Sequence, residues 1–159
     1  MNYHLIPASK EYEEVIKNLM QFYIYDFSEF VACDVENDGL YTAYTGLDLY
    51  WKEINHRFPY LITKDEKYIG FVLVRKIESL EKTYFSIAEF FIMRKYRRLG
   101  IGGLVAKEIF DLHTGKWEVF QKENNKPAQS FWTKIIHAYT QGQFSAYEAD
   151  GKRIQNFEN

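Results

Sequence analysis

Residues 89–112 contain an apolar run, then a glycine-rich turn, then apolar residues at helical spacing, and this order limits the folds that the chain can adopt. The largely apolar run Glu89–Met93 predicts a strand, and apolar residues at helical spacing over Ile101–Leu112 predict an amphipathic helix. The turn between them, Arg97–Gly103, holds two arginines and three glycines. Glycine allows positive φ and close approach of a ligand, and a helix start presents unpaired backbone N–H groups. The segment therefore predicts a strand, a phosphate-binding turn and a helix.

Two common nucleotide motifs do not fit this turn. A P-loop requires Lys-Ser or Lys-Thr after its glycines, and none follows here. A dinucleotide fingerprint requires a third glycine where Val105 stands. The spacing that fits is R-x-x-G-x-G, formed by Arg97, Gly100 and Gly102. Taken alone, the same residues also fit a helix-starting turn with solvated arginines.

Length and composition predict one globular domain over residues 1–159. The single cysteine, Cys33, excludes an intramolecular disulfide and favours a reducing compartment. No secretory signal pattern or membrane-spanning run is present, and a net charge of −2 disfavours nucleic-acid binding. We therefore expect a cytoplasmic protein that binds neither nucleic acid nor membrane.

Hydrophobic periodicity and turn residues predict the order β-α-α-β-β-β-α-β-α-β-β. The predicted strands are Tyr3–Ile6, Arg57–Thr63, Tyr68–Ile77, Thr83–Met93, Lys116–Gln121, Gln143–Ala149 and Arg153–Phe157. The predicted helices follow Ser9, cover Leu47–Ile54, run from the glycine turn to about His113, and follow Asn125.

This order and two motifs resemble the GNAT superfamily of N-acetyltransferases. The first motif is the arginine–glycine turn, and the second consists of Asn125, Ala128, Phe131 and Trp132. The resemblance extends from Tyr3 to Phe157. It implies an α/β (α+β) fold, in which a central twisted mixed sheet of about seven strands is flanked by about four helices.

The resemblance also implies transfer of an acetyl group from acetyl-CoA to a primary amine of a small-molecule or peptidyl substrate, by direct attack in a ternary complex. The implied cofactor-binding residues are Phe91, Ile92, Arg97, Arg98, Leu99, Gly100, Ile101, Gly102, Gly103, Leu104 and Asn125. The histidines and Cys33 show no metal-ligand spacing, so no metal is expected. A homodimer is a family-level expectation. The alternative is a protein of the same fold that binds coenzyme A or acyl-CoA as a sensor without turnover.

Glu89 is the candidate general base, because relatives often use a glutamate on this strand. Its alternative role is that of an outward-facing or salt-bridged strand residue. Many family members carry a tyrosine acid where Trp132 stands, and an indole cannot transfer a proton usefully. Tyr139 and Tyr147 are candidate substitutes, although each also fits a core tyrosine with a satisfied hydroxyl.

The stretch Asn18–Trp51 contains no Lys or Arg. Acidic residues and aromatic residues alternate along it, a composition that suits a cationic substrate. The acidic residues are Asp26, Glu29, Asp34, Glu36, Asp38 and Asp48. A solvated acidic face over an aromatic core is the other interpretation.

Overall fold

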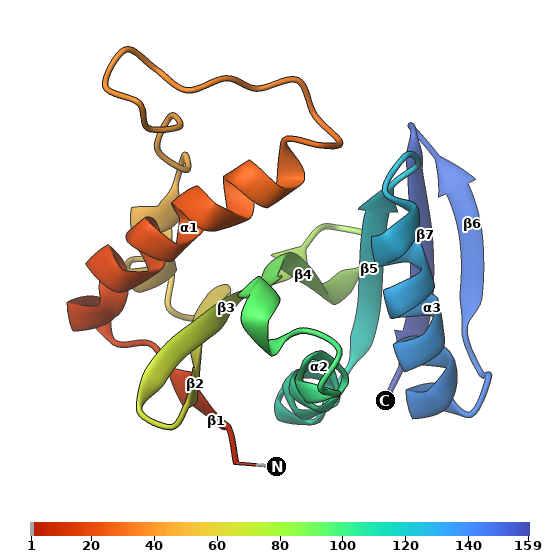
Figure 1. Ribbon diagram of the computed structural model, residues 1–159. Helices are drawn as coiled ribbons and strands as arrows, with labels where there is room; N and C mark the ends of the chain where they lie inside the picture. Colours follow the sequence, from red (N-terminus) through yellow and green to blue (C-terminus); the bar gives the residue numbers. More distant parts are fainter. Residues whose placement is uncertain (1) are drawn as a thin grey trace. The chain divides into compact units, whose positions relative to one another are not determined.

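The computed structural model describes residues 2–159 and contains a seven-stranded sheet of order β1-β2-β3-β4-β5-β7-β6 (Figure 1). The strands are β1 (His4–Pro7), β2 (Arg57–Lys64), β3 (Lys67–Glu78), β4 (Thr83–Ile92), β5 (Lys116–Lys122), β6 (Ser145–Ala149) and β7 (Lys152–Glu158). The α-helices are α1 (Glu13–Phe27), α2 (Ile101–Leu112) and α3 (Lys126–Thr140). Shorter 3-10 helices cover Lys10–Tyr12, Leu47–Trp51 and Arg94–Tyr96.

The predicted mixed sheet and its order of elements are confirmed. β4 and β5 pair in parallel at Phe85 and Trp117, whereas β5 and β7 pair antiparallel. The expectation of about four helices is wrong for residues 2–159, which contain three α-helices. The predicted helix at 47–54 is a five-residue 3-10 helix, in which the Leu49 N–H donates to the Gly46 carbonyl at 3.1 Å.

Contacts divide the chain into two compact units. The first comprises residues up to Val74 together with Ala88–Tyr96, and the second comprises Arg75–Ile87 and Arg97–Asn159. β3 and β4 each contribute residues to both units. The expectation of a single domain stays a prediction, and the two units are described in turn.

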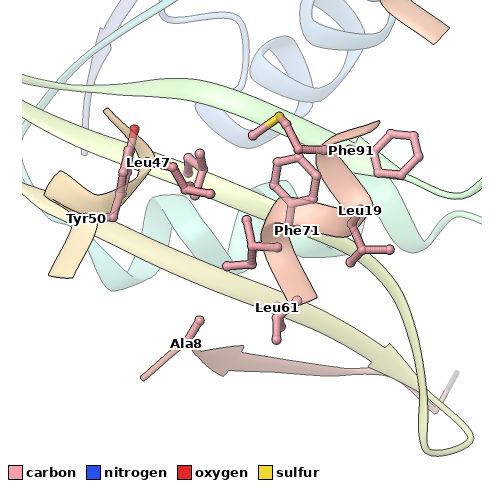
Figure 2. Close-up of a cluster of buried hydrophobic side chains, with 10 residues drawn as sticks. Ala8, Leu19, Leu47, Tyr50, Leu61, Phe71 and Phe91 are labelled. Atoms are coloured by element: carbon pink, nitrogen blue, oxygen red, sulfur yellow. The ribbon is translucent and has the colours of Figure 1, made fainter. Parts of the chain in front are cut away.

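The core of the first unit forms where α1 packs on β2, β3 and the end of β4 (Figure 2). Leu19, Leu61, Phe71 and Phe91 are among its buried side chains. Their burial removes apolar surface from water, which is the main driving force for folding this part of the chain.

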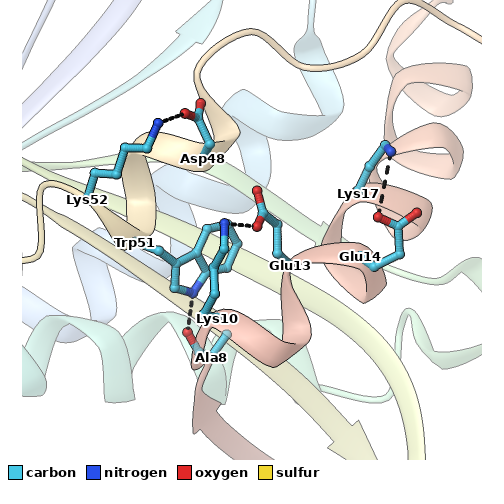
Figure 3. Close-up of polar contacts among 8 residues, drawn as sticks. All are labelled: Ala8, Lys10, Glu13, Glu14, Lys17, Asp48, Trp51 and Lys52. Carbon is cyan, nitrogen blue, oxygen red and sulfur yellow. Dashed lines mark hydrogen bonds and ion pairs between the residues drawn. The ribbon is translucent and has the colours of Figure 1, made fainter.

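Polar contacts at the edge of the first unit fix the 3-10 helix Leu47–Trp51 beside the end of β1 (Figure 3). The Trp51 indole Nε1–H donates to the Ala8 carbonyl at 2.8 Å. Lys52 forms an ion pair with Asp48 at 2.6 Å. The indole bond connects segments 43 residues apart in the sequence, and so constrains the chain that follows α1.

The core of the second unit is aromatic. Phe110 of α2 contacts Trp117 of β5 and Phe157 of β7, with both ring centroid distances at 4.9 Å. The Trp117 and Phe157 rings stack with an interplanar angle of 7°. In Figure 1, α3 lies alongside β5 and β7, and it contacts both strands. This core holds α2, and therefore the turn at its N-terminus, against the sheet.

Candidate functional site

The predicted phosphate turn lies in the second unit and forms the start of α2. Gly100 is the N-cap of the helix, with φ of 81°, and Arg98 has φ of 62°. Such left-handed positions are typical of turns whose backbone N–H groups converge on an anion. Four other non-glycine residues of the described chain, Gln141 at the end of α3 among them, share this backbone, so at Arg98 it defines the turn and does not by itself mark a ligand site.

The side chains of the turn differ in exposure. Arg97 and Arg98 are exposed, and Leu99 and Leu104 are 47% and 43% exposed. Ile101 is fully buried in the core, so only its backbone can meet a ligand. Guanidinium groups suit phosphate oxygens, and the phosphate-binding role of Arg97 and Arg98 stays a prediction.

Gly103 has a packing role that the sequence did not reveal. A Cβ at this position would lie 2.8 Å from Cδ1 of Ile135 on α3. The missing side chain therefore allows α2 to approach α3 closely. Because Cδ1 is the end of a flexible side chain, a small shift of Ile135 could accommodate alanine here, whereas Gly100 is favoured by its left-handed backbone.

Asn125 acts as the N-cap of α3. Its Oδ1 accepts a hydrogen bond from the Ala128 N–H at 3.1 Å, and the residue is 8% exposed. Pro127 follows in the first turn, where its missing N–H costs nothing. The cofactor role of Asn125 stays a prediction, and its capping role is a sufficient local reason for this residue.

Replacing Asn125 by Ala should lower the free energy of unfolding by about 1 kcal/mol, because the N–H of Ala128 loses its acceptor. Urea unfolding monitored by circular dichroism measures the change. Asn125→Asp retains an acceptor and serves as the control. Equal stability of Asn125→Ala and the wild type would contradict the capping role.

Tyr139 and Tyr147 are the candidates for the acid role, and Trp132 stands where many family members carry a tyrosine. Tyr147 lies on β6 and is 44% exposed, so its interpretation as a core tyrosine is wrong. Trp132 is buried and packs against Phe110. The Tyr139 hydroxyl donates to Asp111 at 2.7 Å and accepts from the Asn159 amide at 2.9 Å. Burial, followed by the Asp111 carboxylate, raises the pKa of Tyr139. Asp111 lies in the last turn of α2, at the opposite end from the phosphate turn. These contacts favour the alternative of a core tyrosine with a satisfied hydroxyl.

Phe91 and Ile92 lie at the end of β4 in the first unit, and both are buried. Phe91 packs against Phe71 at 5.8 Å between ring centroids. Its carbonyl oxygen lies so close to Gly70 of β3 that an added Cβ would be 2.1 Å away. The role of Gly70 was missed in the sequence, although an isolated glycine within a strand pattern is a signal of close backbone approach.

Glu89 lies on β4, where its carboxylate meets two tyrosine hydroxyls. The Tyr44 hydroxyl donates to Oε1 at 2.9 Å, and the Tyr23 hydroxyl donates to Oε2. All three residues are partly buried. The interpretation as an outward-facing strand residue is therefore wrong. Tyr23 and Tyr44 are separated from Glu89 by 66 and 45 positions, so no local sequence signal could have paired them.

Burial dominates the electrostatics of this cluster. It raises the pKa of Glu89, while the hydrogen bonds from Tyr23 and Tyr44 lower it. The pKa of Tyr23 is raised by burial and by the neighbouring Glu89. A carboxylate whose pKa is raised binds a proton more tightly, as a general base must, and such groups are typical of functional sites.

Three carboxylates of the acidic stretch Asn18–Trp51 have partners within the first unit. Arg94 pairs with Asp26 at 2.7 Å, and Lys52 pairs with Asp48 at 2.6 Å. Glu36 accepts a hydrogen bond from Thr42 at 2.5 Å. Lys52 directly follows the stretch, whereas Arg94 lies far from it in sequence, and together they pair with two of its six carboxylates. The solvated acidic face and the cation-selecting surface both stay predictions.

Within residues 2–159, no three side chains of the His, Cys, Asp and Glu types are grouped so that they could hold a metal ion. No helix in the same range is both long and apolar enough to cross a bilayer.

Comparison with known proteins identifies a family. The model of the Acetyltransferase (GNAT) family matches residues 17–137, which is more than half of the chain. The matched range contains both the phosphate turn and Glu89. No curated protein sequence matches at a significant level.

Solved structures share the fold at low identity. An acetyltransferase from Thermus thermophilus is 12% identical, with a TM-score of 0.67 and coverage of 100% of this chain and 98% of the other. Arabidopsis thaliana Naa50, in complex with the bisubstrate analogue CoA-Ac-MVNAL, is 11% identical, with a TM-score of 0.65 and full coverage of both chains. PaiA N-acetyltransferase from Thermoplasma acidophilum, in complex with coenzyme A, is 13% identical, with a TM-score of 0.63 and full coverage of both chains.

Proposed function

Because the chain belongs to the acetyltransferase (GNAT) family, we propose that it transfers an acetyl group from acetyl-CoA to a primary amine of a small-molecule or peptidyl substrate. The α2 turn carries this proposal, because it combines left-handed backbone at Arg98 and Gly100 with two exposed arginines. The complexes of similar folds with coenzyme A and with a bisubstrate analogue support acetyl-CoA as the donor. A cytoplasmic location is part of the proposal and is supported by the single cysteine.

The residues of the turn fit the pyrophosphate of acetyl-CoA. Arg97 and Arg98 supply charge-assisted hydrogen bonds, and the helix start supplies backbone N–H groups and a positive dipole end. The backbone near Phe91 and Ile92 would contact the pantetheine and place an N–H near the thioester carbonyl. Such a donor stabilises the oxyanion that develops during acyl transfer.

The first step is removal of a proton from the ammonium group of the substrate. An alkylammonium has a pKa of about 10.4, so it must lose a proton before its nitrogen can attack. Glu89 accepts this proton, directly or through one water. The nitrogen lone pair then attacks the thioester carbonyl carbon and forms a tetrahedral intermediate. The carbonyl re-forms as the C–S bond breaks, coenzyme A leaves as a thiolate, and the nitrogen loses its second proton to this thiolate or to solvent. Because a thiol has a pKa of about 8.5, the thiolate can leave without a dedicated acid.

A panel of amines tests the proposed function. The panel contains a polyamine, an aminoglycoside, a lysine-containing peptide with a blocked N-terminus, and a peptide with a free N-terminus. The assay follows thiol release from acetyl-CoA, and calorimetry measures acetyl-CoA binding separately. Amine-dependent thiol release supports the transferase. Binding without release for any amine supports the coenzyme A sensor, and absence of binding contradicts both.

Replacing Arg97 and Arg98 by Ala should weaken acetyl-CoA binding by roughly tenfold or more, because charge-assisted hydrogen bonds to phosphate are lost. The loss should shrink at high salt, where exposed charges are screened. Isothermal titration calorimetry at two ionic strengths measures both effects. Arg75→Ala removes another exposed arginine, outside the turn, and is the control. An unchanged dissociation constant in the double variant would remove the turn from the binding site.

A further inference from the structure

Glu89 is held by two donors that come from different segments of the first unit. Tyr23 belongs to α1, and Tyr44 belongs to residues 28–46, a segment without α-helix or strand. Each hydroxyl donates to a different oxygen of the carboxylate. Two donors on two oxygens define the plane of the group, so Glu89 has one preferred orientation.

Tyr23 is fixed by its ring contacts. The ring lies 5.9 Å from both Phe71 and Phe91 in edge-on arrangements, and it stacks on Phe27 at 5.7 Å. These neighbours leave the ring little freedom to rotate. The hydroxyl is therefore presented to Glu89 by the packed core of the first unit.

Tyr44 is fixed through the backbone of its own segment. The Gln21 side chain on α1 accepts from the Tyr41 N–H at 2.8 Å and donates to the Tyr41 carbonyl at 3.0 Å. This double hydrogen bond imitates a pair in a β-ladder and attaches the segment to α1 three residues before Tyr44. The position of the Tyr44 hydroxyl thus depends on the attachment of the whole segment.

The two hydroxyls stabilise a negative charge without neutralising it. A salt bridge to Lys or Arg would also stabilise the carboxylate, but it would depress the affinity of Glu89 for a proton much more strongly. Phenol donors are uncharged at neutral pH and occupy only two of the four lone pairs on the carboxylate. The two phenol bonds therefore do not by themselves use up the capacity of the carboxylate to accept a proton.

We infer that Tyr23 and Tyr44 are positioning residues, which hold Glu89 in one orientation and favour its ionised form. This inference rests on the proposed role of Glu89 as the general base. The titratable groups that face Glu89 are Tyr23 from α1 and Tyr44 from the segment, and β3 contributes the apolar Phe71 beside Tyr23. The lowering of the pKa of Glu89 by both hydroxyls agrees with this arrangement.

The test replaces each tyrosine by phenylalanine, which removes the hydroxyl and retains the ring. Rates for Tyr23→Phe, Tyr44→Phe and the double variant are measured from pH 5 to 9 with an amine that the panel identifies. Loss of each donor should raise the pKa of Glu89. The acid limb of the log kcat/KM profile should therefore shift to higher pH, by about one pH unit per hydroxyl. Tyr25→Phe is the matched control, because Tyr25 lies on the same helix and is 64% exposed.

A purely structural role has a different signature, since it lowers the rate at all pH values and leaves the limb in place. That result, together with an unchanged pKa of Glu89, would overturn the inference. Titration of ¹³C-labelled glutamate carboxyls by NMR, with Glu89→Gln to assign the signal, measures the pKa of Glu89 directly and does not require activity. An unchanged pKa in both single variants also overturns the inference. A raised pKa without a shifted rate profile supports the two tyrosines and rejects Glu89 as the base.

Discussion

Glu89→Gln should lower kcat at pH 7 by 10²- to 10⁴-fold, on the order expected for loss of a general base. Gln has nearly the same shape but cannot accept a proton from the ammonium group. Only roughly one amine in a thousand is neutral at pH 7, and the variant must rely on that fraction. Thiol release measured under saturating acetyl-CoA gives the ratio of kcat values.

The affinity for acetyl-CoA should be unchanged in Glu89→Gln, because the proposed contacts to the donor lie elsewhere on the chain. Calorimetry checks this, and Glu81→Gln at an exposed turn is the control for loss of a surface charge. Retention of kcat within a few-fold of the wild type would show that another group, or water, takes the proton.

The same variant has a predictable effect on stability. Burial raises the pKa of Glu89 in the folded protein, so protonation of Glu89 favours folding. This contribution is fully present below the unfolded pKa of about 4.3 and is lost as pH rises through the folded pKa. Gln stays neutral throughout. The free energy of unfolding of the wild type, relative to that of Glu89→Gln, should therefore fall as pH rises across this window.

Gly70→Ala should destabilise the protein by about 3 kcal/mol or more, the largest effect we expect from adding a single methyl group. The new Cβ would lie 2.1 Å from the Phe91 carbonyl oxygen, and a backbone atom cannot rotate away as a side chain can. Either β3 or the end of β4 must move. Both strands contribute to the core of the first unit, so the movement also disturbs Phe71 and Phe91.

Urea unfolding of Gly70→Ala and Gly39→Ala separates a steric cause from a conformational one. Gly39 has φ of +79° and nothing within 4 Å of an added Cβ, so Ala there is strained but not crowded. Gly39→Ala should therefore lower the free energy of unfolding by about 1 kcal/mol. If Gly70→Ala cost no more than Gly39→Ala, the close approach of β4 to β3 would not hold in solution.

Local sequence signals predicted the elements well. Gly100 and the apolar positions after it specified the start of α2, and Asn125 with Pro127 specified the start of α3, because caps and periodicity act within a few residues. The structure of the segment Leu47–Trp51 was harder to predict. Its apolar residues fit a helix, but only one 3-10 segment forms there, fixed by the distant bond from Trp51 to Ala8.

The candidate site was less accessible to sequence reasoning. Glu89 was selected through a family resemblance, yet its partners Tyr23 and Tyr44 come from segments that only the tertiary structure brings together. Likewise, the acidic stretch lacks cations in sequence, but Arg94 reaches Asp26 from 68 positions away. Long-range pairing of this kind depends on the packing of α1 against the strands, which a single sequence does not encode locally.

Gly103 gives the arginine–glycine turn a second evolutionary constraint. Glycine at position 100 is favoured by the left-handed backbone of the turn, whereas glycine at position 103 leaves room for the side chain of Ile135 on α3. Alanine at position 103 therefore needs only a small shift or a shorter side chain at position 135, whereas alanine at position 100 must adopt a left-handed backbone. A motif that requires glycine at both positions would overlook chains that keep the same turn conformation.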